Sequence, residues 1–479
     1  MRSKYVSLLD LIKLLDNKSL SERYIRYIAG FHHKKQYRHD EILTVASLVS
    51  FLGKEEPIYS SFLYSYEIPR LNKEFDLLRF NMNEVINIEL KSQPKDEGEM
   101  LKQLKQNEYY LKILNKKAYY FLYIASINTL LKLDHDQLVP ASADELKTLL
   151  KGKPSNLELD QVFAPSRILV SPLNDPARFL ANDYLLTENQ HHIHSKIIPD
   201  LLSKNVVSYY CINGKPGTGK SLLLFDIAKS LTSKGVVTLI HNGKKCQGHY
   251  ELERLLPSLK IVESADLTES NIALSSFILV DEAQRLSLAS LTNIKHWTEL
   301  YSIPVVFSTV EDKKMFATSE SEAIVQTILS LCEDRIYNLT GRIRGNKEIS
   351  IFISCIFELN KYQDHYAFPH IKIVFEQDAN KAKETAKLLI QEGYQYLLYD
   401  EQDNNKEGQW SPSEVIGQEF DKVVMVLDGR FYYESNRLCA DNALCKSLLY
   451  QGLTRAKSEI ALIIETKDLL QGVLTLFNS

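Results

Sequence analysis

The amino-acid sequence predicts an α/β protein with an N-terminal α/β domain followed by two lobes built on parallel sheets. In the second part of the chain, apolar runs rich in β-branched residues alternate with helix-length stretches, the pattern of strands joined by crossover helices. These runs are 206–213, 236–242, 277–283, 303–309, 371–376, 394–400, 422–428 and 459–466. In the first part, residues 74–92 indicate two short strands joined by a turn, and 116–126 indicates a further strand.

Composition and length set the broad class. With 479 residues the chain is long enough for two to three domains. The predicted boundaries are 1–150 for the first domain, 151–179 for a proline-rich linker, 180–345 for the first lobe and 346–479 for the second.

Several function classes are disfavoured by the same data. No apolar run approaches the roughly 18–20 residues of a membrane helix, so no membrane association is expected. The N-terminal helical pattern contains Asp10 and Asp16, which is atypical of a secretory signal. The six cysteines show no CxxC pairing. We therefore expect a cytoplasmic protein with reduced thiols. The net charge of -4 does not indicate a nucleic-acid partner. It does not exclude one, because large enzymes that act on nucleic acids often confine their positive charge to a groove.

The stretch "GKPGTGKS" (214–221) satisfies the P-loop pattern GxxxxGK[ST] between a strand and a helix. Glycines 214, 217 and 219, with Thr218 among them, let backbone N–H groups close around phosphate oxygens. Lys220 is expected to reach the β- and γ-phosphates of ATP, and Ser221 to ligate Mg²⁺.

Two acidic residues end the apolar run "FILVDEAQRL" (277–286). Asp281 is predicted to hold the Mg²⁺ ion and Glu282 to polarise the attacking water. Together with the P-loop, this pair predicts nucleotide hydrolysis.

Further motifs resemble superfamily-1 helicases over about residues 180–479: "LLTENQ" (185–190), "NLTGRIRGN" (338–346), "GQEFD" (417–421) and "LTRAK" (453–457). The resemblance implies two RecA-like lobes, with Gln190 reading adenine and Glu419 near the ribose. It also implies that Arg344 and Arg455 reach the γ-phosphate from the second lobe.

The sequence departs from that family in two places. Where the family has an acid and a glutamine after the fourth strand, this chain has Val310 and Lys313, with Glu311 and Asp312 beside them. The intervals 243–281 and 344–417 are too short for large inserted domains. The four residues "HHIH" (191–194) could suggest zinc, but they fall on the helix after the glutamine motif, and we do not expect a metal site there.

In a strand at 85–91, alternation places Glu89 and Lys91 on one face. Asp76 lies on the preceding strand of the predicted hairpin. Two carboxylates can bind Mg²⁺ or Mn²⁺, and a lysine can position the activated hydroxide. Glu74 is an alternative to Asp76, Glu41 on an earlier helix could add an acid, and Gln103 or Gln106 could assist. A solvated strand face with an ion pair is the competing interpretation.

The spacing D-x(12)-E-x-K resembles the PD-(D/E)xK nucleases, which implies a restriction-endonuclease-like first domain. The whole arrangement resembles bacterial nuclease–helicase immunity proteins. This likeness implies ATP-dependent, Mg²⁺-dependent cleavage of DNA in anti-phage defence.

Two alternatives stay open: a nucleic-acid-stimulated ATPase with an inactive first domain, and an ATP-binding sensor or scaffold without turnover. The residues do not distinguish DNA from RNA, and a homo-oligomer through the N-terminal helices is a further expectation.

Overall fold

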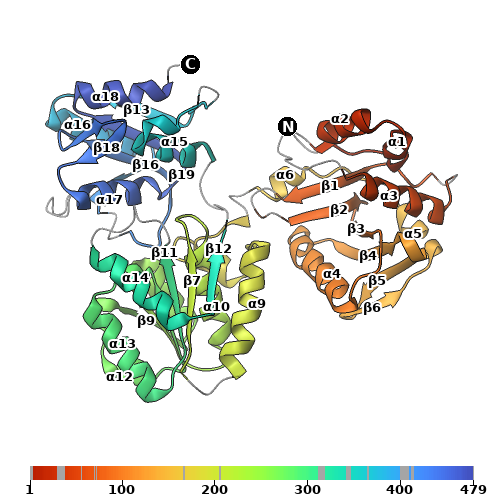
Figure 1. The fold of residues 1–479 in the computed structure, drawn as a ribbon, viewed down its shortest axis with the longest axis horizontal. Helices are drawn as coiled ribbons and strands as arrows, with labels where there is room; N and C mark the ends of the chain where they lie inside the picture. The colour runs from red at the N-terminus through yellow and green to blue at the C-terminus, as the bar shows by residue number, and fades with distance from the viewer. Residues whose placement is uncertain are drawn as a thin grey trace. The chain divides into compact units, whose positions relative to one another are not determined.

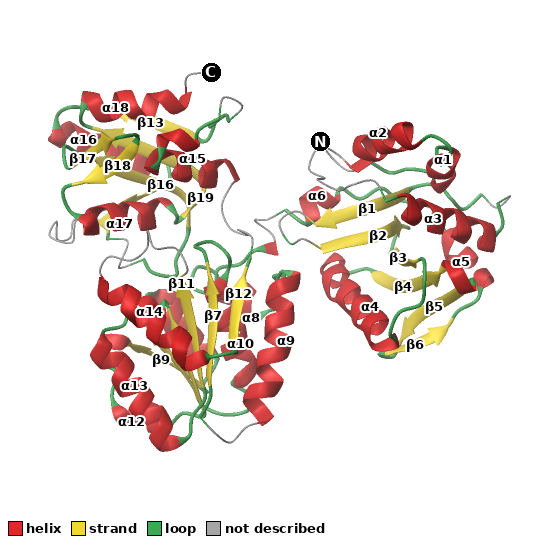
Figure 2. Cartoon of the chain, viewed as in Figure 1, coloured by secondary structure: helices red, strands yellow, loops and turns green. Residues whose placement is uncertain are grey.

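The structure is a computed structural model. It describes residues 4–29, 38–54, 57–68, 71, 73–164, 168–203, 207–310, 319–340, 347–363, 366–399, 409–411 and 415–477. They belong to two compact units, Met1–Ile168 and Leu169–Ser479. Figure 1 labels the elements of each unit and Figure 2 separates helices from strands. Among the described residues, no helix has both the length and the apolarity that crossing a membrane requires.

The first unit is built on a six-stranded sheet whose neighbours follow the chain from β1 to β6. Its strands are β1 (Phe62–Ile68), β2 (Lys73–Phe80), β3 (Glu84–Lys91), β4 (Lys117–Ile124), β5 (Thr129–Asp134) and β6 (Gln137–Pro140). All neighbouring pairs are antiparallel except β3 and β4, which are parallel. A parallel pair needs a crossover connection, and α4 (Glu97–Leu111) provides it.

Helices pack on both faces of this sheet. One core contains Ile86, Ile88 and Leu90 of β3 together with side chains from four helices. These helices are α1 (Leu8–Lys13), α2 (Lys18–Ala29), α3 (His39–Leu52) and α5 (Ala143–Leu150). The alternate side chains Asn87 and Glu89 contact α4 instead. The short helix α6 (Leu159–Val162) completes the unit.

The segment expected to be a linker is partly packed on this unit. Asn81 forms a β-bridge with Pro154, and the Tyr5 hydroxyl donates a 2.9 Å hydrogen bond to the Leu157 carbonyl. Phe163 is fully buried. Despite its proline-rich composition, the segment therefore contacts the first unit at Pro154, Leu157 and Phe163.

The first lobe of the second unit has a parallel sheet of strand order β12-β7-β11-β10-β8-β9. The strands are β7 (Tyr209–Gly214), β8 (Val237–His241), β9 (Leu259–Glu263), β10 (Phe277–Asp281), β11 (Val305–Val310) and β12 (Ile336–Leu339). One face is covered by α8 (Pro176–Leu180), α9 (Glu188–Ser203), α10 (Lys220–Leu231) and α11 (Gln247–Leu255). The other face is covered by α12 (Glu269–Ala273), α13 (Leu288–Tyr301) and α14 (Ser319–Cys332).

The second lobe has a parallel sheet of order β13-β19-β16-β14-β15 and a separate hairpin, β17–β18. The strands are β13 (Ile371–Phe375), β14 (Tyr394–Leu397), β15 (Gln409–Trp410), β16 (Phe420–Leu427), β17 (Phe431–Glu434), β18 (Arg437–Ala440) and β19 (Ala456–Ile464). Its helices are α15 (Lys347–Phe357), α16 (Ala379–Gln391), α17 (Ala443–Leu453) and α18 (Lys467–Leu474). The predicted α/β class with parallel sheets is confirmed.

Candidate active sites

The loop between β7 and α10 has the conformation that a phosphate cradle requires. Gly217 and Gly219 have φ values of +78° and +81°, which L side chains rarely adopt. A Cβ on Gly214 would lie 2.9 Å from the Leu339 carbonyl oxygen and from Thr218 Oγ1. Glycine is therefore needed at each of these three positions. The Thr218 hydroxyl donates to the Lys215 carbonyl at 2.9 Å and fixes the turn.

Lys220 and Ser221 begin α10 and face this loop and β10. The Lys220 ammonium donates to the carbonyls of Gly214 and Lys215 at 2.9 and 3.1 Å, so the side chain lies along the loop. Ser221 Oγ donates to Asp281 Oδ1 at 3.2 Å. The hydroxyl and carboxylate that the sequence assigns to one magnesium ion are thus in contact.

The end of β10 carries two acids in different electrostatic environments. Asp281 is fully buried, and burial followed by the adjacent Glu282 raises its pKa to about 6. Within the described residues its Oδ2 atom has no hydrogen-bond partner. A buried carboxylate with an unpaired oxygen, next to a serine hydroxyl, fits a hard divalent cation such as Mg²⁺.

Glu282 adopts a left-handed backbone conformation with φ +51°. Such conformations of non-glycine residues cost energy and concentrate at functional sites. Burial works against its charge, but three neighbouring cations lower the pKa of Glu282, with the largest effect from Arg285. The carboxylate is therefore held ionised, as a group that orients or deprotonates water must be.

The second lobe contributes side chains to the same pocket. Its lining combines first-lobe residues with residues of the second lobe: Pro216, Gly217, Gly219, Lys220, Ser221, Glu282, Val310, Glu419, Thr454 and Arg455. Arg455 is close enough to Glu282 to act on its charge, and its buried Nε has no partner among the described residues. A guanidinium in this position is suited to phosphate oxygens.

Glu419 is hydrogen-bonded to a residue of the segment predicted to be a proline-rich linker. Asn174 donates from Nδ2 to the Glu419 carbonyl at 2.6 Å, and its Oδ1 accepts from the Glu419 N–H at 3.3 Å. The Asn174 side-chain amide thus pairs with the backbone N–H and C=O of a single residue of the second lobe, and Glu419 lines the pocket.

Gln190, expected to read adenine, is 1 % exposed and contacts the backbone. Its Nε2 donates to the carbonyls of Thr218 and Gly219 at 3.2 and 3.1 Å, and its Oε1 accepts from Thr187 N at 2.8 Å. In this arrangement Gln190 supports the P-loop. Arg344 and residues 311–313 lie outside the described residues.

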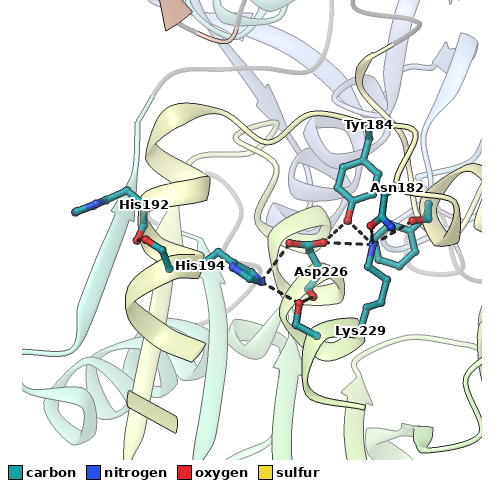
Figure 3. Close-up of polar contacts among 9 residues, drawn as sticks. Asn182, Tyr184, His192, His194, Asp226 and Lys229 are labelled. Atoms are coloured by element: carbon teal, nitrogen blue, oxygen red, sulfur yellow. Dashed lines mark hydrogen bonds and ion pairs between the residues drawn. The ribbon is translucent and has the colours of Figure 1, made fainter. Parts of the chain in front are cut away.

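The histidines of α9 do not converge on a common point. Figure 3 shows His192 and His194 directed away from each other. His194 Nε2 lies 3.0 Å from Ser230 Oγ and 3.4 Å from Asp226 Oδ2, and burial lowers its pKa. Asp226 also binds Lys229 and the Tyr184 hydroxyl (Figure 3). The cluster ties α9, α10 and the preceding segment together. None of these histidines joins a metal-binding group among the described residues.

In the first unit, Asp76 on β2 and Glu89 on β3 interact directly. Burial, followed by the neighbouring Glu89 carboxylate, raises the pKa of Asp76 well above its usual range. The Leu90 N–H donates to Asp76 Oδ2 at 2.8 Å, and Lys91 favours the charged form. Two carboxylates this close repel one another unless a proton or a cation lies between them.

Amide groups of α4 hold Glu89, which is 1 % exposed. Asn107 Nδ2 donates to Glu89 Oε1 at 2.7 Å and to Asn87 Oδ1 at 2.7 Å, while Gln103 Nε2 donates to Glu89 Oε2. Gln103 is one of the two glutamines expected to assist. Asn107 was not predicted, although its spacing of four from Gln103 puts both on one helix face.

A second group of acids adjoins Asp76. One carboxylate oxygen from each of Glu41, Glu74 and Asp76 lies within 4.8 Å of the others, the one such group found in the described part of the chain. Glu41 begins α3 and accepts from the Tyr64 hydroxyl at 3.0 Å. Asp76 thus lies between Glu89 on one side and this pair on the other.

Other residues were not found from the sequence. Pro216 and Thr454 line the nucleotide pocket, and Thr454 directly precedes the predicted Arg455. Gln284 and Arg285 follow the predicted acids, and both contact Glu282. Their position within "DEAQR" was the available signal.

Comparisons with known proteins give a weak likeness. No protein-family model and no curated protein matches the chain. A Pif1 helicase from Bacteroides, in complex with ADP-AlF3 and ssDNA, aligns at 12% identity and TM-score 0.34, covering 59% of this chain and 93% of that one. A structure of two coordinating Pif1 helicases at forked dsDNA gives 13% and 0.33, covering 61% and 96%. Pif1 helicase from Candida albicans gives 11% and 0.33, covering 61% and 99%. Likenesses this weak do not by themselves assign a function to the chain.

Proposed function

We propose that the second unit hydrolyses ATP in a pocket shared by its two lobes and couples hydrolysis to movement along DNA, as a superfamily-1-type helicase. One observation carries the proposal: the P-loop lysine, the Ser221–Asp281 contact, Glu282 and Arg455 of the second lobe meet in one pocket. Nucleotide enclosed by both lobes would link its hydrolysis to their relative motion.

Each residue has a role in this scheme. Glycines 214, 217 and 219 and the N-terminus of α10 bind the phosphates, and Lys220 neutralises them. Ser221 and Asp281 would hold Mg²⁺, which supplies charge neutralisation at the β- and γ-phosphate oxygens. Glu282 orients the attacking water and takes its proton. Arg455 stabilises the charge that develops on the transferred phosphoryl group.

The test is steady-state ATP hydrolysis with and without a single-stranded oligodeoxynucleotide. Lys220→Ala should abolish hydrolysis. Glu282→Gln should bind ATP but turn it over at least about 100-fold more slowly, because it removes the proton acceptor while conserving shape. Hydrolysis that persists at wild-type rates in both variants would refute the assignment. Binding without turnover in the wild type would favour an ATP sensor.

We propose further that the first unit is a metal-dependent nuclease of the PD-(D/E)xK type. The observation that supports it is the contact of Asp76 with Glu89, next to Lys91 and the Glu41–Glu74 pair. Asp76, with acids from either side, would hold Mg²⁺ or Mn²⁺, which supplies a nucleophilic hydroxide near neutral pH. Lys91 would position the scissile phosphate by its charge.

The test is cleavage of end-labelled single- and double-stranded DNA, and of RNA, with Mg²⁺ and with Mn²⁺. Lys91→Ala should abolish cleavage and leave ATP hydrolysis intact. Lys95→Ala, which removes an exposed lysine four residues further on, is the matched control. Equal cleavage by the wild type and Lys91→Ala would remove Lys91 from the site. Absence of cleavage with DNA-stimulated ATPase intact would favour a motor with an inactive first unit.

If both activities are present, the resemblance to nuclease–helicase immunity proteins extends the proposal to ATP-regulated degradation of phage DNA in bacteria.

A further inference from the structure

Arg285 lies between the acid Glu282 and the second lobe. Its Nε is 3.8 Å from Glu282 Oε2, an ion pair between two largely buried side chains. Its Nη2 donates a hydrogen bond to Gln451 Oε1. Arg285 belongs to the short turn after β10 in the first lobe, whereas Gln451 belongs to α17 in the second. One guanidinium therefore joins the acid of the first lobe to a helix of the second.

Both ends of this chain of contacts are fixed by other side chains. Gln451 is 3 % exposed, and its Nε2 donates to Ser447 Oγ at 3.0 Å, which orients Oε1 toward its partner. On the other side, Gln284 Nε2 donates to Glu282 Oε2. Each of these side chains is buried. Hydrogen bonds between buried side chains hold them in a defined geometry.

The acceptor on the second lobe, the Gln451 amide oxygen, is neutral, and its neutrality affects how Arg285 interacts with Glu282. An unrestrained arginine beside a buried carboxylate is drawn into a close charge-assisted pair. A carboxylate engaged in this way has fewer lone pairs to orient a water molecule. Gln451 binds the guanidinium without adding charge, and it holds Arg285 at 3.8 Å from Glu282.

We propose that Arg285 and Gln451 form a relay through which contact with the second lobe positions Glu282 for hydrolysis. The inference rests on the proposed ATPase function. Arg285 is a positioning residue in this scheme, since it acts through Glu282. When the lobes separate, Arg285 loses Gln451 and closes its 3.8 Å ion pair with Glu282 into a direct hydrogen bond, so hydrolysis stops until the lobes close again.

The relay bears on a feature of the neighbouring strand, β11. The last residue of β11, where superfamily-1 motifs offer a polar coupling residue, is Val310, which is 1 % exposed and has no polar side-chain group. Arg285 and Gln451 give a second route between the lobes, one strand away.

The experiment measures kcat and KM for ATP in the full chain, with and without a single-stranded oligodeoxynucleotide. Gln451→Leu should lower kcat about tenfold or more and leave KM within about twofold, because the contact acts on the acid and not on bound nucleotide. In an Arg285→Gln background, Gln451→Leu should cause no further loss, since its partner is already absent.

Control variants distinguish a failure of the relay from a failure of the proposed ATPase function. Arg254→Gln removes an exposed arginine of α11 and Lys446→Gln a side chain of α17 outside the relay, and both should match the wild type. Wild-type hydrolysis with an unchanged kcat in Gln451→Leu would overturn the relay alone. Losses in Arg285→Gln and Gln451→Leu that multiply in the double variant would overturn it as well. If the wild type hydrolyses ATP no faster than Lys220→Ala, the proposed function fails, and the relay fails with it.

Discussion

Two buried histidines of the first lobe should make the second unit sensitive to mild acid. His241 ends β8 and His249 lies in the first turn of α11, and neither side chain is exposed to solvent. Their ring centroids are 4.3 Å apart. Burial is the main reason that the pKa of His241 falls to about 4 and that of His249 to about 2, with the neighbouring histidine adding to the effect on His249.

The sign and size of the effect follow from proton linkage. Unfolding exposes both imidazoles, whose pKa returns to about 6.5, so below that pH the unfolded chain binds protons that the folded chain excludes. Stability is therefore fully present above pH 6.5 and decreases as the pH falls toward the folded pKa. Each excluded proton costs about 1.4 kcal/mol per pH unit. Between pH 7 and 4.5, His249 alone accounts for about 2.5 kcal/mol.

His249→Gln isolates this contribution. His249 Nδ1 accepts from the Cys246 N–H at 3.0 Å in a capping box, and glutamine at this position can make the same bond without titrating. Urea unfolding of the second unit can be followed by tryptophan fluorescence, because both tryptophans, Trp297 and Trp410, belong to it. The variant should lose about 2.5 kcal/mol less than the wild type between pH 7 and 4.5.

The exposed His296→Gln variant serves as the control and should keep the wild-type pH dependence. Parallel curves for the wild type and His249→Gln across this range would refute the reasoning. That result would mean that His249 is already protonated in the folded chain or protected to the same degree in the unfolded one.

Three further substitutions test other parts of the structure. A Cβ on Gly248 would lie 2.0 Å from the Leu173 carbonyl oxygen, so Gly248→Ala should cost about 1–3 kcal/mol in urea unfolding, whereas the exposed Gln247→Ala should be neutral. Asn107→Leu removes a donor from Glu89 and should lower DNA cleavage about 10–100-fold, with partial recovery at high Mg²⁺. Equal loss in the control Lys102→Ala, which changes an exposed side chain of the same helix, would contradict this. Ile88→Ala leaves a cavity beside α3 and should lower the free energy of unfolding by about 2–5 kcal/mol, followed by circular dichroism. The control Ile127→Ala removes an exposed side chain and should be neutral. A neutral result for Ile88→Ala as well would show that this core relaxes around the missing side chain.

Strong local patterns made much of the fold predictable. The eight apolar runs of the second part all became strands of the two parallel sheets, and the hairpin at 74–92 became β2 and β3. Buried central strands need continuous apolar side chains, and that need is visible in one dimension. Three of the four edge strands of these two sheets were missed: β9 is "LKIVE", β12 is "IYNL" and β15 has two residues, whereas the edge strand β13 was predicted from its apolar run. Such strands are completed by pairing with a neighbour, which their own sequence does not reveal.

The candidate sites likewise contain some contacts that follow from local motifs and others that depend on tertiary packing. Ser221 and Asp281 belong to motifs whose spacing fixes their geometry, and their contact follows from the connection of a P-loop helix to the adjacent strand. The contact of Asn107 with Glu89 depends on how α4 is rotated on the sheet, which no local pattern specifies. The contact of Arg285 with Gln451 depends on how two lobes meet. Sequence separation in these cases hides the partner, since each residue on its own resembles an ordinary polar helix residue.

Five strands of the first lobe and the five strands of the second lobe's parallel sheet follow the same order, but the turns after corresponding strands differ. In chain order, β7, β8, β9, β10 and β11 correspond to β13, β14, β15, β16 and β19. After β7, a glycine-rich turn leaves the first amide groups of α10 available for phosphate. After β13, the N-cap of the equivalent helix α16 is Asp378, whose Oδ1 accepts from the N–H groups of Asn380 and Lys381 at 2.9 and 3.0 Å.

A carboxylate of the chain itself thus satisfies the donors that a phosphate would bind. Asp378 makes the second lobe unsuited to cradle a nucleotide at this position, although its topology is the same. What the second lobe offers instead lies at the opposite ends of its strands, where Thr454 and Arg455 directly precede β19 and line the pocket of the first lobe. Among the described residues, the turn after β7 therefore has amide groups available for a phosphate, whereas the equivalent turn after β13 has its own carboxylate bound to them.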